Sequence, residues 1–344
     1  MKVSICIPQY NRIHYLLKSL ALIEQQTYLN IEITISDDGS TDETEEAIQK
    51  LSAHYKYPIV YDRNPSNLGY DRNYRKCIEM ASGEYVIVIG NDDSIYGNDS
   101  IAYLVNFLRE NNFPDIGFCN MIEERTNNTL IERATETKVI GYGKEVALKY
   151  YSCFSFVGGL IYKQESFLKS NTSKCDGSIY SQMYIGVHMV ANGARLFSIK
   201  QPLVLKDILL NGVFRKGYRD RIAKNWKDFR IVDGGLPSVI NVLISALKDS
   251  GKLDQKDSYY IFERIYAITY PHWILDYKEN GALPEAVGLI RGLNPAKNQN
   301  LYLLNYINKA KIYAIYFISS TAALVTPVFM FKKLKPKLYT FFKR

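Results

Sequence analysis

Two adjacent carboxylates, Asp92 and Asp93, follow an unbroken apolar run at residues 85–89, with only Gly90 and Asn91 between. A short run of this kind, without alternation, predicts a strand buried on both faces, as in a parallel sheet. Ligands of open α/β sheets bind beyond the carboxyl ends of such strands. Paired carboxylates repel each other there unless a cation bridges them, and Mg²⁺ sites combine one or two carboxylates with substrate phosphates. The pair therefore predicts a cation site, although Asn91-Asp92-Asp93 also suits a solvated turn.

Polar loops follow the other predicted strands of the N-terminal part as well. The strand runs predicted at 3–7, 31–35 and 59–61 lead into the loops 8–12, 37–42 and 63–70. Between the runs, apolar residues recur at helical spacing, and Ser40 with Glu43 forms a capping box that predicts a helix start. This alternation of strands and helices predicts a mostly parallel, doubly wound α/β sheet flanked by helices. Such a sheet brings the loops to one edge.

Beyond Asp93 the alternation is looser. The patterns predict helices at 101–108, 143–151 and 182–191, strands at 116–120, 156–162 and 196–199, and an irregular or hairpin segment at 123–138. From about residue 220 to 308 the apolar periods are helical, which predicts a C-terminal helical extension.

The composition bounds the class of protein. With 344 residues and 47% hydrophobic content, the chain suits two domains or one large α/β domain with additions. Its five cysteines are scattered, odd in number and without metal-ligand spacing, which indicates reduced thiols in a cytosolic protein. The N-terminal apolar run is too short for a signal peptide and ends at Pro8.

The net charge of +8 is concentrated in the last segment, which contains no Asp or Glu. A basic tail of this kind favours contact with anionic lipid over nucleic-acid binding. Residues 312–331 carry no charge over about the length of a membrane-spanning helix, and lysines flank them. Tyr313 and Tyr316 suit a membrane interface, whereas Ser320 and Pro327 dilute the apolar character. The segment is expected to contact a membrane; whether it spans, re-enters or lies flat stays open, and a buried helix is the alternative.

The motifs in their order resemble glycosyltransferase family 2. They are Pro8-Gln9-Tyr10-Asn11, Gln26-Thr27-Tyr28, Asp37-Asp38-Gly39-Ser40-Thr41-Asp42, Asn67-Leu68-Gly69, Arg72-Asn73, Ala81-Ser82-Gly83-Glu84-Tyr85 and Gly90-Asn91-Asp92-Asp93. The resemblance is strong over about the first hundred residues and weakens through about residue 210. The Gly-Asn-Asp-Asp form is similar to transferases of surface-polysaccharide assembly, including abequosyltransferase-like members. The resemblance implies a GT-A fold, a nucleotide-diphosphate sugar donor and a divalent cation, Mn²⁺ or Mg²⁺.

The resemblance also implies roles for individual residues. Those matching donor-binding positions are Pro8, Tyr10, Asn11, Arg12, Asp37, Asp38, Asn67, Gly69, Arg72 and Asn91. Among them, Asp38 matches the carboxylate that accepts from the nucleobase, and its alternative role is to cap a helix. Arg72 is equally consistent with a solvated helix charge. Asp92 and Asp93 match the end of the family's Asp-x-Asp metal motif.

Two positions depart from the family pattern. Gly90 stands where many members have the first Asp of the metal motif, which predicts weaker metal affinity. Ser181-Gln182 stands where inverting members carry Glu-Asp, whose Asp is the base, and Gln182 cannot accept a proton at neutral pH. Asp176 or His188 is the expected substitute, with Asp176 preferred because His188 points away from Gln182 on an ideal helix.

We therefore expect a transferase domain at 1–210, a helical extension at 211–308 and a membrane-associating tail at 309–344. The expected function is transfer of a sugar to a lipid-linked glycan in bacterial surface-polysaccharide synthesis, at the cytoplasmic face of the inner membrane. The expected partners are the nucleotide-sugar donor, a glycan acceptor carried on polyprenyl diphosphate and the membrane, with no nucleic acid. The alternatives are a donor-binding subunit without catalysis, suggested by Ser181-Gln182, and a nucleotidyltransferase. The latter class usually has a Gly-rich phosphate loop, which 8–12 lacks.

Overall fold

The computed structural model describes residues 1–213 and 238–334 of the chain. Contacts divide the chain into two compact units. Residues 1–177 and 181–215 form the first, and 178–180 with 216–344 form the second. Each unit is described below by itself.

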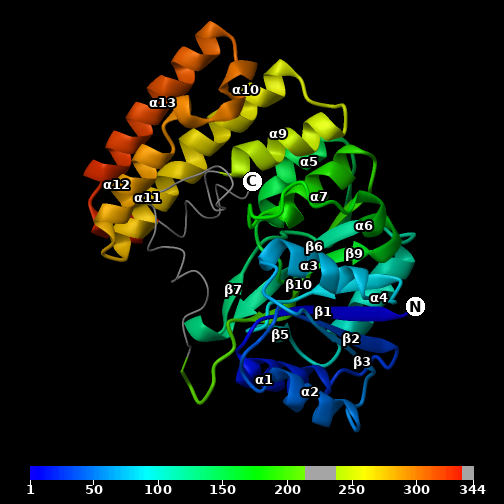
Figure 1. The fold of residues 1–344 in the computed structure, drawn as a ribbon. Helices are drawn as coiled ribbons and strands as arrows, with labels where there is room; N and C mark the ends of the chain where they lie inside the picture. The colour runs from blue at the N-terminus through cyan, green and yellow to red at the C-terminus, as the bar shows by residue number, and fades with distance from the viewer. Residues whose placement is uncertain (214–237, 335–344) are drawn as a thin grey trace. The chain divides into compact units, whose positions relative to one another are not determined.

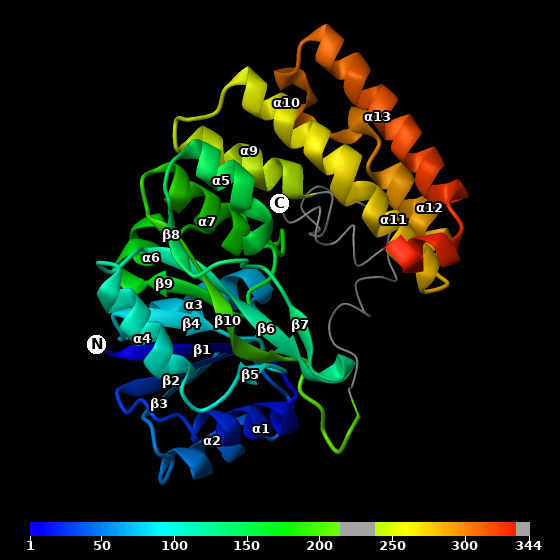
Figure 2. The same ribbon diagram turned by 180° about the vertical axis from the view of Figure 1, so that it is seen from behind.

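The first unit is built on one mixed sheet (Figures 1 and 2). Its strands are β1 Val3–Gln9, β2 Ile31–Asp37, β3 Ile59–Arg63, β4 Tyr85–Val88, β5 Ser94–Ile95, β6 Ile116–Glu123, β7 Thr129–Ile131, β8 Lys138–Gly141, β9 Leu160–Lys163 and β10 Leu196–Lys206. The strand order is β3-β2-β1-β4-β9-β6-β10-β5, with β7 on β6 and β8 on β10. Strands β3, β2, β1, β4, β6 and β10 run in one direction, and β9 lies antiparallel between β4 and β6. The carboxyl ends of the six parallel strands therefore meet at one edge.

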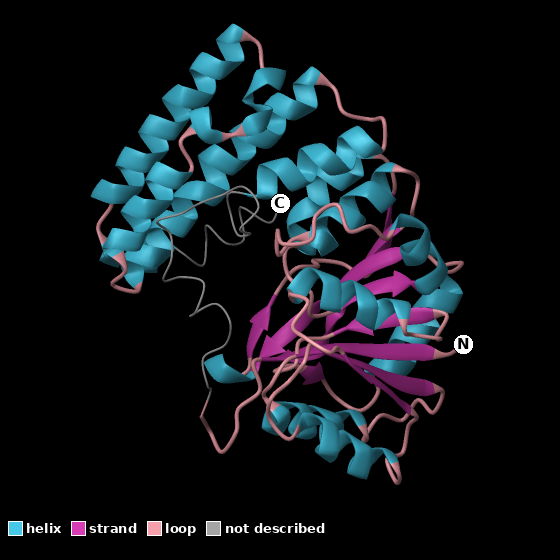
Figure 3. Ribbon diagram, in the orientation of Figure 1, coloured by secondary structure: helices cyan, strands magenta, loops and turns pink. Residues whose placement is uncertain are grey.

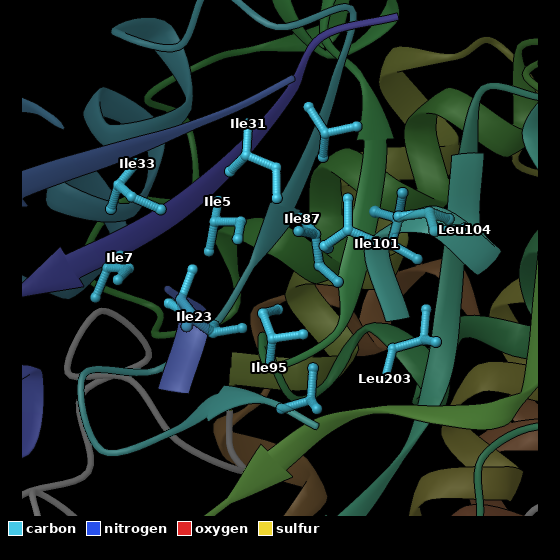
Figure 4. Close-up of a cluster of buried hydrophobic side chains, with 14 of the residues drawn as sticks. Ile5, Ile7, Ile23, Ile31, Ile33, Ile87, Ile95, Ile101, Leu104 and Leu203 are labelled. Atoms are coloured by element: carbon cyan, nitrogen blue, oxygen red, sulfur yellow. The ribbon is translucent and has the colours of Figure 1, made fainter. Parts of the chain in front are cut away.

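Helices cover both faces of this sheet. They are α1 Ile13–Ile23, α2 Thr44–Ser52, α3 Tyr70–Glu79, α4 Ser100–Glu110, α5 Lys144–Tyr150, α6 Gln164–Ser170 and α7 Ser181–Ala191, with short 3₁₀ turns η1 Glu124–Thr126 and η2 Tyr151–Phe154. Because side chains alternate along a strand, Ile5 and Ile7 join the apolar cluster with α1 and α4 (Figure 4). The intervening Cys6 faces α3, where its thiol lies 3.6 Å from the carbonyl oxygen of Cys77. Burial on both faces explains the continuous apolar run of β4.

The predicted elements of the first hundred residues are confirmed, but two local predictions are wrong. Helix α2 begins at Thr44 and has no side-chain cap of the predicted kind. Ser40 instead donates its hydroxyl to Asp37, at 2.5 Å, and accepts from the Asn11 backbone, at 2.7 Å, so it is not available as a cap. The last strand does not stop at residue 199, because β10 continues to Lys206 through register shifts around Pro202. Pro is tolerated in a sheet at such irregularities.

The second unit is helical in its described part (Figure 3), as predicted for the extension. Its elements are α9 Val239–Asp249, α10 Gln255–Arg264, the π-helical η5 Ile265–Thr269, α11 Tyr270–Glu279, α12 Leu283–Gly292, the 3₁₀ turns η6 Pro295–Lys297 and η7 Gln299–Leu303, and α13 Tyr306–Val325. In the described ranges no single helix is long and apolar enough to cross a membrane. Taken together, helix α13 and the helix at 328–334 have the length and apolar composition of a membrane span, but the two helices are bent by 105° relative to each other.

Candidate functional site

Three carboxylates gather at the carboxyl edge of the sheet. Asp92 and Asp93 follow β4, and Asp207 follows β10, with ligand oxygens that all lie within 4.8 Å of one another. Backbone hydrogen bonds fix them: the Asp207 amide donates to Asp93 Oδ1 at 3.0 Å, and the Ile208 amide donates to the Asp92 carbonyl at 2.9 Å. Two strands far apart in the sequence thus build one acidic cluster, and Asp207 was not foreseen from the sequence.

The cluster is electrostatically strained. Asp93 is buried, and burial together with repulsion from Asp92 raises its pKa to about 7. Burial also raises the pKa of Asp207, although Lys206 opposes the shift through an ion pair with this carboxylate. Lys206 is itself shared with Glu123, 2.5 Å away. Clustered carboxylates with raised pKa values are a setting in which a bound divalent cation would relieve repulsion. The residues present therefore fit a cation.

Gly90 leaves space that the two carboxylates occupy. A Cβ atom at position 90 would lie 2.9 Å from Asp93 Oδ2 and 3.1 Å from Asp92 Oδ1. Gly158, in another loop, lies against the same oxygen of Asp93. A Cβ atom at position 158 would also be 2.9 Å from Asp93 Oδ2. The departure at position 90 thus makes room for the two carboxylates, and Asp207 brings a third carboxylate to the cluster in place of the missing one.

Arg12 lies beside the cluster. Its guanidinium Nη1 is 2.5 Å from Asp92 Oδ2 and stands over the Tyr15 ring, 5.1 Å from the ring centroid. Asn11 and Arg12 both adopt positive φ, 53° and 65°, a conformation that non-glycine residues rarely hold without support. The support includes Asn11 Oδ1, which accepts from the Thr41 amide at 2.9 Å. The loop after β1 is therefore preset to direct a cationic side chain toward the carboxylates.

Asp37 and Asp38 hold the neighbouring loops in place. Asp37 is fully buried and accepts from the Ser40 amide at 2.9 Å and the Tyr61 hydroxyl at 2.7 Å. Asp38 accepts from the backbone amides of Leu68 and Gly69, at 2.7 and 3.1 Å. Both of its oxygens thus have protein partners, which gives Asp38 a loop-ordering role whether or not it also meets a ligand.

The remaining donor-loop residues surround these two. Asn67 Oδ1 accepts from the Gly69 amide at 3.0 Å, and Gly69 has φ of 86°, which favours glycine. Asn91 donates to the Tyr10 carbonyl at 3.3 Å, which joins the loops after β1 and β4. Arg72 is exposed on α3. Pro8 lies in β1 opposite Ser36 of β2.

The three base candidates lie in different settings. Asp176 forms a two-pronged ion pair with Arg75, with Nε–Oδ1 2.9 Å and Nη2–Oδ2 2.5 Å. Both oxygens of the carboxylate are thus engaged by one guanidinium, which disfavours the role of a mobile base. Gln182 is buried in the first turn of α7. His188 stacks on Tyr184 with ring centroids 5.7 Å apart, which is consistent with packing.

Two further residues near the site escaped sequence reasoning. Asp71, buried on α3, accepts from the Ser181 amide at 3.1 Å and so fixes the first turn of α7. Arg133 donates to the carbonyl oxygens of Phe156 and Gly158, at 3.2 and 2.6 Å, and thereby shapes the loop that abuts Asp93. For Asp207 a signal existed: an apolar triplet, 203–205, precedes Lys206-Asp207 as in the other site strands.

Comparison with known sequences agrees with this geometry. The profile described as glycosyl transferase family 2 matches residues 4–169. The chain is 33% identical over 225 residues to abequosyltransferase RfbV of Salmonella typhimurium. That match covers 60% of this chain and 66% of the relative, just under two thirds of its length.

Solved structures show the same fold. S. aureus TarS 1–349 in complex with UDP matches with a TM-score of 0.54 and 17% identity, over 94% of this chain and 91% of that chain. Mannosyltransferase PcManGT from Pyrobaculum calidifontis, in complex with GDP-Man and Mn²⁺, matches with a TM-score of 0.51 and 15% identity, over 94% and 87%. The predicted GT-A-type sheet with a C-terminal helical region is thereby confirmed.

Proposed function

Because residues 4–169 make this chain a member of glycosyltransferase family 2, we propose that it transfers a sugar from a nucleotide-diphosphate sugar to a glycan hydroxyl. The observation that carries the proposal is the cluster of Asp92, Asp93 and Asp207 at the edge where the donor-loop residues also converge. A diphosphate is the ligand that such a cluster, with a cation, is suited to hold.

The donor is held by the loops after β1, β2 and β4. Tyr10 is exposed and offers its ring to the nucleobase, while Asn11 and Asn67 offer amide groups to the nucleoside. Asp38 keeps the loop of Leu68 and Gly69 in position for this contact. The exposed Arg72 is available to the phosphates.

Asp92, Asp93 and Asp207 would hold the cation, which when bound stabilises the negative charge on the leaving diphosphate. Arg12 pairs with Asp92 in the described state and offers a second positive charge to the same phosphates. PcManGT, whose structure contains Mn²⁺ and GDP-Man, supports a cation in this fold.

The acceptor hydroxyl must lose its proton as the glycosidic bond forms. Of the candidates, Asp176 is paired with Arg75 and Gln182 has no basic group, so neither is well suited. The Nε2 atom of His188 lies 3.1 Å from the side-chain amide nitrogen of Asn192, and imidazole is a side chain suited to act as a base. We propose that the donor phosphate takes the proton. A large loss of turnover on substitution of Asp176 or His188 would instead identify that residue as the base.

The acceptor is proposed to be a lipid-linked glycan of a bacterial surface polysaccharide, such as an O-antigen or capsule. The abequosyltransferase relative supports a hexosyl or deoxyhexosyl donor and this setting. The exposed apolar residues of the C-terminal helix pair support work at a membrane surface, which we propose to be the cytoplasmic face of the inner membrane. A peripheral or anchored position through this segment fits a polyprenyl-diphosphate-linked acceptor.

A thermal-shift panel tests the proposal. The full chain is heated with UDP-, GDP-, CDP- and dTDP-sugars, each with Mn²⁺ and with a chelator. One nucleotide should raise the melting temperature only with the cation, because a ligand bound to the native state stabilises by mass action. Absence of any cation-dependent shift across the panel would contradict the proposal.

A donor-binding subunit without catalysis is the second candidate, and Ser181-Gln182 at the family's base position is the observation that favours it. Release of free nucleoside diphosphate from the donor that shifts melting separates the two. Turnover supports the enzyme, whereas binding without turnover, with and without membrane-extracted acceptor, supports the inert subunit.

A further inference from the structure

Helix α13 presents two opposite faces of different character. One is buried within the helical unit through Ile312, Tyr316, Ser320 and Ala323. Tyr316 donates to the Ile290 carbonyl at 2.9 Å, and the Ser320 hydroxyl lies 3.0 Å from that of Tyr270. This face is fixed by packing and hydrogen bonds.

The opposite face is apolar and exposed. Ile307, Phe317, Ile318 and Val325 each expose more than 60% of their surface. At roughly 100° per residue, Ile318 and Val325 lie about half a turn from Tyr316. Alanines 310, 314 and 322 extend the same exposed side.

The segment after α13 repeats this arrangement. The helix at 328–334 follows a bend of 105°. Its Phe331 is buried and packs edge-on against His272, with ring centroids 5.6 Å apart. Its Phe329, Met330 and Leu334 are exposed. Lys278 fixes the bend, since its ammonium donates to the carbonyl oxygens of Ala323 and Thr326, both at 2.8 Å.

The charged residues of the segment itself have one sign. Lys309, Lys311, Lys332 and Lys333 lie near the two ends, and no Asp or Glu follows Glu285 in the sequence. Anionic headgroups complement such a surface, and buried apolar side chains with surrounding lysines are the pattern of interfacial helices. A second copy that docked through the same segment would bring lysines against lysines, because the segment has no carboxylate to pair with them.

We propose that α13 and residues 328–334 form an in-plane docking surface for an anionic phospholipid membrane. The outer face, Ile307, Phe317, Ile318, Val325 and Phe329, enters the headgroup boundary, and the packed face keeps the helical unit above it. The helix pair does not cross the bilayer, because one side of each helix is already occupied by protein. This inference rests on the membrane association included in the proposed function.

Vesicle flotation tests the surface. The full chain should float with vesicles of phosphatidylcholine and phosphatidylglycerol (3:1) at least tenfold more than with phosphatidylcholine alone. The double variant Phe317→Ser/Ile318→Ser should lose at least tenfold of this binding. Leu29→Ser, which removes an equally exposed apolar side chain from the first unit, is the control and should bind as the unmodified chain does.

The cation-dependent thermal shift by nucleoside diphosphate is measured on the same variants. It should persist in Phe317→Ser/Ile318→Ser, so that loss of docking is distinguished from loss of donor binding or of folding. Unchanged flotation of that variant would overturn the proposal. A shift from monomer to dimer that the same double variant abolishes, without vesicle binding, would show that a second copy covers the surface and would also overturn it.

Topology distinguishes lying flat from spanning. Epitope tags are placed at both ends of the chain, and protease is added to inside-out inner-membrane vesicles from expressing cells. Both tags should be cleaved, because both ends lie on the cytoplasmic side. Protection of the C-terminal tag alone would show that the helix pair crosses the membrane.

Discussion

Replacing Asp93 by Asn should change how the stability of the cation-free protein depends on pH. The carboxyl has a pKa of about 7 in the folded state, against an ordinary value of 3.8. Between these values the folded state retains a proton that the unfolded state has lost. The free energy of unfolding therefore falls as pH rises through this window, and the loss is complete above about pH 7.

The magnitude follows from the part of the window that is measured. Within the measured range of pH 5 to 8, the free energy of unfolding of wild type falls between pH 5 and the folded pKa of about 7. This interval is about two pH units, each worth about 1.4 kcal/mol, so the fall amounts to about 3 kcal/mol. The amide that replaces the carboxyl in Asp93→Asn does not titrate. The substitution also removes one of two acceptor oxygens, which receive the Gly90 and Asp207 amides at 3.1 and 3.0 Å, and so costs about 1–3 kcal/mol at every pH.

Between pH 5 and pH 8 the variant should consequently gain about 3 kcal/mol in the free energy of unfolding relative to wild type, and it should be the more stable of the two at pH 8. Urea unfolding in a chelating buffer, followed by circular dichroism, measures the difference at each pH. Glu32→Gln is the control: burial opposes ionisation of Glu32, but hydrogen bonds from Lys2, Ser4 and Ser82 outweigh it and lower its pKa to about 2. Its stabilisation is lost only below about pH 4.5, outside the measured range. The strained-carboxylate reasoning would be refuted if the difference in the free energy of unfolding between wild type and Asp93→Asn changed by less than about 0.5 kcal/mol from pH 5 to pH 8. This threshold corresponds to about a third of one pKa unit.

Three further outcomes are expected. Asp207→Asn should weaken Mn²⁺-dependent nucleotide binding about tenfold by removing a charged ligand, whereas Glu124→Gln, which removes a nearby carboxylate paired with Lys18, should leave it within twofold in calorimetry. Gly90→Ala should weaken the same binding at least tenfold because its Cβ would crowd Asp93 Oδ2, and adding it to Asp93→Asn should cost less than the sum of the two effects. Asp176→Asn should lower the free energy of unfolding by about 2 kcal/mol or more by leaving the buried Arg75 without its main partner; a tenfold fall in turnover at unchanged stability would instead identify Asp176 as the base.

Much of the sheet could be predicted because burial on both faces leaves a direct mark on sequence. The run at 85–89 is apolar without alternation, the run at 3–7 is apolar except for Ser4, and a polar loop that carries site residues follows each of them. The loops after β1, β2 and β4 were therefore predicted to meet, and the contacts of Arg12 with Asp92 and of Asn91 with Tyr10 bring the first and last of these together.

The rest of the site depends on pairings that sequence spacing does not reveal. Strand β9 enters antiparallel between β4 and β6, and β10 extends through irregular register around Pro202, which carries Asp207 to the cluster. The Arg75–Asp176 pair joins residues 101 positions apart. Asp176 looked like an unengaged loop carboxylate in the sequence because its partner comes from a distant helix. From the sequence, Gly90 predicted only weaker metal affinity, because the crowding by Asp92 and Asp93 is visible only in three dimensions.

The most direct measurement is calorimetric titration of UDP, GDP, CDP and dTDP into the full chain with Mn²⁺ and with chelator. The proposed function predicts saturable binding of at least one nucleotide with Mn²⁺, and at least tenfold weaker binding with chelator, in Asp92→Asn and in Asp93→Asn. Binding that is unchanged by the chelator and by both substitutions would contradict a cation site at these carboxylates. Absence of binding for all four nucleotides would contradict the nucleotide-sugar assignment itself.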